Sequence, residues 1–147
     1  MRALTSSAFL FLLLAAILAG QVWWIATGPW LLYPQGGLLA EFDTLLHFSG
    51  GVWVALFLLR MLRSAASPVR FANWWWRALG IVACVALVGV LWEFYEFFAD
   101  RIILGAAYKN QPSVFDTMLD LFADILGGLA VALAGRDKGK RPDRREI

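Results

Sequence analysis

Four long apolar runs dominate the order of hydrophobic and polar residues along the chain. They cover residues 7–32, 44–62, 77–98 and 114–134, with short polar stretches between them. Each run comes close to the roughly 20 residues that a helix needs to cross the hydrocarbon layer of a bilayer. The pattern therefore predicts an all-α polytopic membrane protein, folded as a four-helix transmembrane bundle.

The first run is too long to be the core of a signal peptide, which has about 7–15 apolar residues. Ala19-Gly20 resembles a cleavage site, but the apolar residues continue beyond it through Val22 and Trp23. We therefore expect a retained first helix that ends near Gly28-Pro29.

Composition supports a membrane protein with a single domain. Hydrophobic residues make up 61% of the 147 residues, and the mean hydropathy is +0.66. A soluble domain of this size could not bury so much apolar surface. The spans account for residues 1–135 and leave a basic tail at 136–147. The chain has one cysteine, so no internal disulfide can form, and we expect Cys84 to be a small core residue.

Lysine and arginine predict the orientation of the bundle. The connection after the second run, with Arg60, Arg63, Arg70 and Arg77, lies on the same side as Arg2 and the basic tail. The opposite connections hold only Arg101 and Lys109. The positive-inside rule then places both termini in the cytoplasm, in a bacterial inner membrane. Trp74-Trp75-Trp76 would mark the cytoplasmic interface, and Trp30 and Tyr33 the other one. The basic tail suits an anionic lipid surface, and we expect no nucleic-acid partner.

Acidic residues lie where a membrane protein rarely has them. Eight of the eleven carboxylates lie within or at the edge of the apolar runs. An ionisable side chain at the centre of a membrane helix costs roughly 2.5–3.5 kcal/mol, so it normally faces a partner, a cavity or an ion. The eight form three groups: Glu41 and Asp43 with His47; Glu93, Glu96 and Asp100; and Asp116, Asp120 and Asp124.

The three groups are predicted to meet at one depth. The second and fourth helices would enter from the outer side and the third would leave there, so all three groups fall in the outer turns. Residues three and four apart share one face of a helix, so each group forms a stripe. Small residues continue the stripes towards the cytoplasm and favour close helix packing there: Gly50; Ala86 and Gly89; and Gly127, Gly128 and Gly135. The first helix, without such charges, would close the side of the bundle through Leu, Phe and Trp packing.

So many carboxylates in one pocket cannot all stay ionised without cations. Either some are protonated or a metal is bound. Carboxylates with one imidazole suit Mg²⁺, Mn²⁺ or Ca²⁺ better than Zn²⁺ or iron. A di-iron centre is not expected, because such bundles use more than one histidine. The predicted metal ligands are Asp43, His47, Glu93, Glu96, Asp120 and Asp124, with Asp100 and Asp116 as further polar residues of the site.

Structural roles remain alternatives for several of these residues. Asp43 and Asp116 could be helix N-caps, whose side-chain oxygens accept from exposed amide groups. Glu41 would then lie in water and His47 would be a neutral core histidine. Capping does not account for Glu93, Asp120 and Asp124, which lie too deep in the helices.

Three stretches resemble a family of small bacterial inner-membrane proteins of the YjdF type. They are Asp43-Thr-Leu-Leu-His47-Phe-Ser-Gly-Gly51, Trp92-Glu-Phe-Tyr-Glu96-Phe and Asp116-Thr-Met-Leu-Asp120-Leu-Phe-Ala-Asp124-Ile-Leu-Gly127. More distantly they are similar to VanZ-like proteins, which are associated with resistance to glycopeptide antibiotics. The last helix lacks a clear copy of the VanZ pattern, so that phenotype is not carried over. The resemblance implies that the acidic positions belong to a family pattern, and it assigns no activity.

Two classes of function fit these patterns. In the first, the protein is a metal-assisted enzyme acting on a lipid or polyprenyl phosphate, with His47 as general acid or base. Its Asp-x-x-x-Asp-x-x-x-Asp helix resembles the metal-pyrophosphate motifs of membrane prenyl transferases. In the second, it is an accessory subunit of a membrane complex or part of a cation or proton pathway. Membrane lipids, a second copy of the chain or a larger complex are the expected partners.

Overall fold

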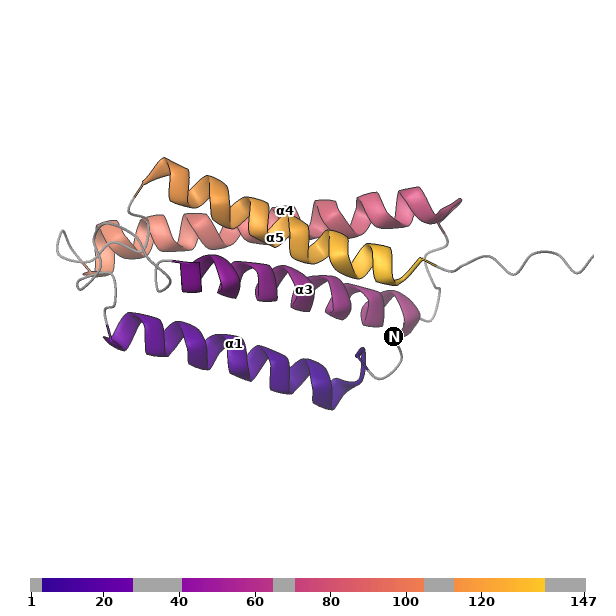
Figure 1. Ribbon diagram of the computed structural model, residues 1–147, viewed down its shortest axis with the longest axis horizontal. Helices are drawn as coiled ribbons and strands as arrows, with labels where there is room; N and C mark the ends of the chain where they lie inside the picture. The colour runs from indigo at the N-terminus through magenta and orange to yellow at the C-terminus, as the bar shows by residue number, and fades with distance from the viewer. Residues whose placement is uncertain (1–3, 28–40, 65–70, 105–112, 137–147) are drawn as a thin grey trace, which may run out of the picture.

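The computed structural model describes residues 4–27, 41–64, 71–104 and 113–136, which form four long α-helices along a common axis (Figure 1). These helices are α1 (Ser7–Thr27), α3 (Glu41–Ser64), α4 (Trp74–Phe98) and α5 (Val114–Ala134), and a π-helix, η1 (Ala99–Leu104), extends α4. Each of the four is long and apolar enough to cross a membrane. The predicted all-α, four-helix membrane fold is confirmed.

Helix boundaries follow from local capping. Asn73 accepts a hydrogen bond from the Trp76 amide, so α4 begins at Trp74, three residues before the predicted start. Ser113 accepts from the Asp116 amide in the same way at the start of α5. Ser113, and not Asp116, is therefore the N-cap of that helix. Residues 28–32 of the predicted first span and 137–147 of the basic tail, like Trp30, Tyr33 and Lys109, lie outside the described residues.

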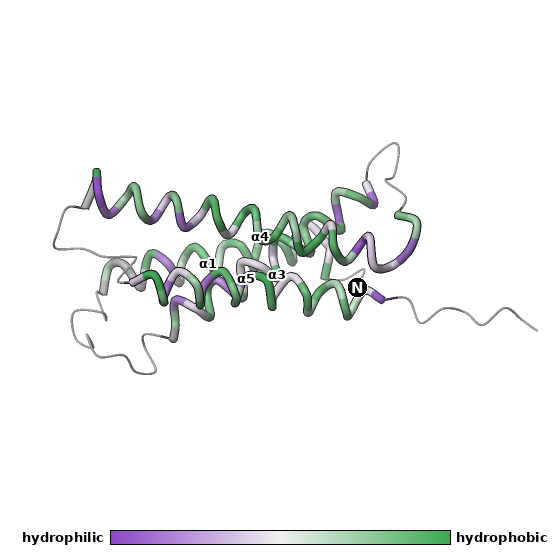
Figure 2. The backbone as a smooth tube through the Cα atoms, turned by 90° about the horizontal axis from the view of Figure 1, so that it is seen from above, coloured by the Kyte–Doolittle hydropathy of each residue, from purple (hydrophilic) through white to green (hydrophobic). Residues whose placement is uncertain are grey.

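The central helix of the bundle is α3, which packs against α5, α4 and α1. Figure 1 shows α1 beside α3 at one edge, with α4 and α5 on the other side. The apolar core lies in the half of the bundle where α3 and α5 end, and includes Ala55, Leu56, Ile81, Val85 and Val131. Figure 2 shows hydrophobic residues along most of each helix and hydrophilic ones towards the ends.

Glycines allow the closest helix contacts, as the sequence predicted, but on α3 the glycine in contact is not the predicted one. A Cβ on Gly51 would clash with the backbone carbonyl of Asp124, and one on Gly127 would clash with the carbonyl of Phe48. Gly50 has room for a Cβ, with its nearest neighbour at 3.9 Å. The crossing of α3 and α5 therefore depends on Gly51 and not on the predicted Gly50. Gly135 is the C-cap of α5.

The edge helix α1 packs on α3 through aromatic and aliphatic side chains, as predicted. The Trp53 indole donates a 2.8 Å hydrogen bond to the Leu10 carbonyl, and Trp24 lies against Phe42. The prediction for Cys84 was wrong, because this side chain is exposed on α4. The helical phase that turns Glu93 inward turns Cys84 outward.

We call the end of the bundle where α1 and α4 begin the basic end. There Arg60 donates to the Thr5 carbonyl at 3.0 Å, and Arg77 donates to the Gly135 carbonyl at the end of α5. The Trp74 indole donates to the Ala132 carbonyl, so this tryptophan serves a helix end, whereas Trp75 and Trp76 are exposed. A helix end leaves carbonyls without intrahelical partners, and Arg77 and Trp74 satisfy two of these at the end of α5.

Candidate metal centre

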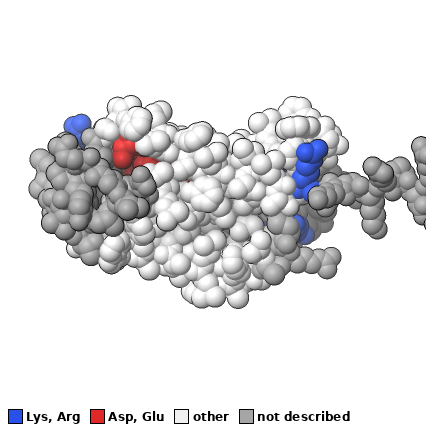
Figure 3. Space-filling model, viewed as in Figure 1, with Lys and Arg blue, Asp and Glu red and all other residues white. Residues whose placement is uncertain are grey.

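The opposite end, which we call the acidic end, brings together seven ionisable side chains from three helices. They occupy positions three or four apart, and so point from each helix towards the other two. Six are buried, with Glu96 and Asp120 only 2% exposed, and Asp116 is partly buried. In Figure 3, a small acidic patch is visible among the described residues of this end. The seven, which we call the acidic cluster, are Asp43 and His47 of α3, Glu93 and Glu96 of α4, and Asp116, Asp120 and Asp124 of α5.

Six of these residues form three groups with the spacing of metal ligands. In each group, one nitrogen or oxygen atom from every residue lies within 4.8 Å of the others. The groups share His47, Asp43 and Asp120, so they form one continuous set. They are Asp43–His47–Glu96, His47–Glu93–Asp120 and Asp43–Asp116–Asp120.

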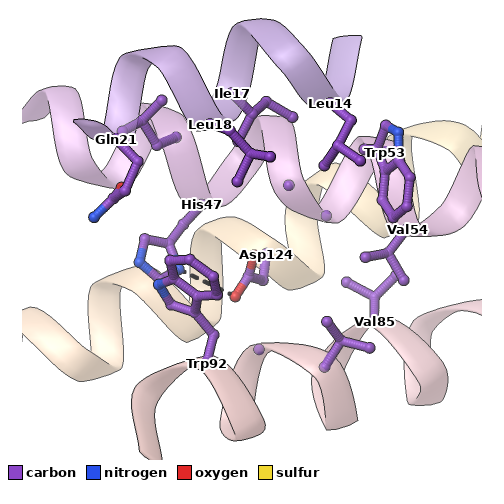
Figure 4. A pocket seen from close by; sticks show the side chains of 15 residues that line it. Leu14, Ile17, Leu18, Gln21, His47, Trp53, Val54, Val85, Trp92 and Asp124 are labelled. Atoms are coloured by element: carbon purple, nitrogen blue, oxygen red, sulfur yellow. Dashed lines mark hydrogen bonds and ion pairs between the residues drawn. The ribbon is translucent and has the colours of Figure 1, made fainter. Parts of the chain in front are cut away.

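His47 is held by the seventh residue. Its Nδ1 lies 3.3 Å from Oδ2 of Asp124 (Figure 4), and its Nε2 lies 3.8 Å from Oε1 of Glu93. With the proton on Nδ1, the ring donates to Asp124 and turns the lone pair of Nε2 towards Glu93. Metal-binding histidines usually have such a carboxylate behind them, which fixes the ring and its tautomer.

Asp124 owes its position to two glycines. Gly51 lets the backbone of α5 approach α3 at Asp124 itself, and Gly89 leaves room for the Asp124 carboxylate against α4. A side chain at either position would displace the carboxylate that holds His47. The glycine contacts therefore position the site as well as the helices.

Several buried polar atoms of the cluster have no hydrogen-bond partner within the part of the chain that the structure describes. They are Oδ1 of Asp43, Nε2 of His47 and Oδ1 of Asp120. A buried polar atom without a partner costs about 1–3 kcal/mol, and folded proteins contain few of them. Three such atoms on two facing helices indicate a place for a ligand that can satisfy them together.

Trp92 is a residue of the site that the sequence did not single out. Its indole donates a 2.9 Å hydrogen bond to Oε1 of Glu96, one helical turn further along α4. The spacing of four residues was visible in the sequence. The eight tryptophans offered no way to tell this one from those expected at the membrane interfaces.

Two of the predicted site residues differ from their predicted roles. Asp124, predicted as a metal ligand, belongs to none of the three ligand groups and contacts His47. Asp116, predicted as a further polar residue, belongs to one of the groups. Asp100 lies in η1, half-buried and outside the groups. Arg101 is exposed, with its guanidinium 5.3 Å from the ring centroid of Phe97.

Comparison with known proteins gives the chain a family. Residues 1–141 match the family described as "Predicted membrane protein (DUF2238)". The chain belongs to this family. It is an integral membrane protein with several spans.

One curated relative is an uncharacterised protein of Thermotoga maritima, which is 34% identical over 94 residues. The aligned stretch covers 61% of this chain and 45% of that protein. The chain thus spans less than half the length of this relative. No solved structure matches the chain.

Proposed function

We propose that this DUF2238 protein binds one or two divalent cations in the acidic cluster and uses them to hold the phosphate of a lipid. The observation that carries the proposal is the set of buried atoms without partners inside the ligand groups. His47 and Asp120 each contribute one such atom to the His47–Glu93–Asp120 group, which draws its ligands from three different helices. This group is our first choice for a cation.

The donor atoms suggest which cation binds. Five of the six residues in the groups are carboxylates and one is an imidazole, a set that suits Mg²⁺ or Mn²⁺, and Ca²⁺ where more oxygens gather. Asp124 would orient His47 from behind. Loss of such an outer carboxylate typically weakens metal binding 10–100-fold.

A bound cation would change the charge of the site. Without one, the acidic cluster repels a phosphate; with one or two, it offers a positive centre that polarises a phosphate oxygen. This proposal supports an enzyme acting on a lipid or polyprenyl phosphate. In it His47 is a metal ligand, and this role replaces the predicted one of general acid or base.

Orientation belongs to the same proposal. The arginines of the basic end favour a cytoplasmic location for that end, by the positive-inside rule. The acidic end would then face the outer side of the bacterial inner membrane. The YjdF-type resemblance is compatible with this location.

The alternative of a cation or proton pathway through one molecule receives less support. Below the acidic cluster, the bundle is filled by apolar side chains such as Leu56, Ile81 and Val85, and by the close contact at Gly51. An ion pathway needs polar groups or water along its length. In the described core, the side chains between the acidic cluster and the basic end are apolar.

Binding of Mn²⁺ to detergent-purified protein, followed by electron paramagnetic resonance after treatment with EDTA, tests the proposal. We expect one or two bound Mn²⁺ ions per chain, competed by Mg²⁺. Asp120→Asn and His47→Gln should each weaken binding by about 100-fold or more, because each removes a ligand. Asp100→Asn, which lies outside the groups, is the control and should bind as the wild type does. Equal binding by all four proteins would contradict the proposal.

A further inference from the structure

A cavity of about 210 Å³ lies beside the acidic cluster, between α1 and α4 and over α3 (Figure 4). Its walls are mostly apolar. In Figure 4, Leu14, Ile17 and Leu18 project from α1 towards Val54 of α3 and Val85 of α4. An apolar cavity of roughly 150 Å³ stays dry and takes up benzene, so this one can hold a stretch of hydrocarbon.

The mouth of the cavity faces the interior of the membrane. Leu18 of α1 and Val88 of α4 line the cavity and are 48% and 43% exposed, so the opening lies between these two helices. Both residues lie near the middle of helices that can span a bilayer. At that depth the surroundings are lipid chains and not water, so a hydrocarbon chain can enter where an ion cannot.

The inner wall of the cavity belongs to the acidic cluster. His47 and Asp124 line it, together with Gly51 and Gly89. Trp92 also lines it and donates to Glu96, so its indole lies at the boundary between the cavity and the acidic cluster.

The order of the two regions along the helices matches the order within a lipid molecule. The carboxylates lie towards the helix ends, and Val54 lies eleven residues beyond Asp43 on α3, or about 16 Å deeper. A lipid of that leaflet has its headgroup near the surface and its chain towards the midplane. The cavity and the cluster present the complementary surfaces in the same order.

We infer that the cavity binds a hydrocarbon chain of a phosphate-bearing membrane lipid, which enters sideways between α1 and α4 and brings its phosphate to the cations of the acidic cluster. The inference rests on the proposed function for the phosphate, but the chain-binding cavity can be tested separately. According to this inference, the ligand of the site is a lipid phosphate in the membrane and not a soluble phosphate.

Photolabelling in lipid nanodiscs tests the inference. The full chain is reconstituted in phosphatidylcholine containing a phosphatidic acid with a diazirine in its acyl chain, and labelled residues are mapped by mass spectrometry. We expect label at Leu14, Val54 and Val88. Val88→Trp, which fills the exposed mouth, should reduce this labelling by about tenfold. Leu87→Trp is the control, since Leu87 is 60% exposed and does not line the cavity.

The metal content of the same samples separates the two proposals. If Val88→Trp keeps its metal and is labelled as strongly as Leu87→Trp, or if label spreads evenly over the lipid-facing residues, the cavity inference is overturned and the metal centre stands. The second probe is a diacylglycerol with the same diazirine chain. We expect it to label the cavity about tenfold less than the phosphatidic acid does, and EDTA to remove this difference. Equal labelling by both probes without EDTA would overturn the phosphate assignment.

Discussion

The two ends of the bundle treat their charged groups in opposite ways. At the basic end, Arg60, Arg63 and Arg77 each donate to an oxygen of another segment, and Arg136 lies 4.9 Å from the ring centroid of Trp74. At the acidic end, carboxylates from three helices face one another, and Oδ1 of both Asp43 and Asp120 lacks a partner among the described residues. Among the described residues, the arginines of the basic end have partners within the chain, whereas two carboxylate oxygens of the acidic end have none.

This difference separates structural polar groups from functional ones. Arg77 and Trp74 satisfy carbonyls at the end of α5, and Arg60 and Arg63 donate to the carbonyl and the hydroxyl of Thr5, so stability alone explains them. The acidic cluster costs stability, since it crowds carboxylates together and leaves buried polar atoms without partners among the described residues. A membrane protein that keeps such a cluster is expected to use it.

Separating α3 from α5 should abolish the difference between the acidic end and the basic end, and should have the largest effect on stability. Gly51→Ala places a methyl group against the Asp124 carbonyl and should lower the free energy of unfolding by about 1–3 kcal/mol. Gly50→Ala, at the neighbouring position with space for the methyl group, should change it little. Thermal unfolding in detergent measures both, and an equal loss in the two variants would contradict the described crossing.

A divalent cation should stabilise the acidic end only. At a Mg²⁺ concentration of about 100 times its Kd, the wild type should gain about 2.7 kcal/mol and a correspondingly higher Tm. Asp120→Asn should lose this gain, yet match or exceed the wild type in EDTA, because it removes one of the repelling charges. Arg77→Ala should keep the gain. Identical Mg²⁺ responses in wild type and Asp120→Asn would contradict a cation-binding role for the acidic cluster.

Asp124→Asn tests the support behind the metal ligand. The amide can still occupy the space next to Gly89, but it no longer offers a charged acceptor to His47. Mg²⁺ affinity should fall about 10–100-fold without loss of the fold. Calorimetric titration measures this, and an unchanged affinity would show that Asp124 does not orient His47.

Arg77→Ala should have the smallest effect. It removes one hydrogen bond to the carbonyl of Gly135, which should cost about 1 kcal/mol of stability. Cation affinity at the other end should stay the same, as circular-dichroism melting and a parallel Mg²⁺ titration would establish. A change in affinity would mean that the two ends are coupled.

The fold was predictable because the length and hydropathy of each span can be read directly from the sequence. The shared depth of the acidic groups also follows from the order of the helices. The order of the helices does not show which of Gly50 and Gly51 meets α5. Neighbouring residues point about 100° apart, so the choice depends on the rotation of α3. The outward position of Cys84, in contrast, could have been predicted, because its place in the helix is opposite that of Glu93, which was expected to face inward.

Contacts between distant segments could not be predicted from spacing. Asp124 carries the same charge as Asp120, and only the packing of three helices places one behind His47 and the other among the ligand groups. The pairing of Arg77 with Gly135, 58 residues apart, is of this kind. The cavity is also of this kind, since it exists because α1 rests on α3 and leaves an opening towards α4.

Anomalous X-ray diffraction from crystals grown with Mn²⁺ tests the central claim most directly. We predict a Mn²⁺ peak within coordination distance of Nε2 of His47 and carboxylate oxygens of Glu93 and Asp120, with Asp124 still hydrogen-bonded to Nδ1. Crystals of Asp120→Asn grown in the same way should lack this peak. A wild-type map with no Mn²⁺ peak in the acidic cluster would contradict the account.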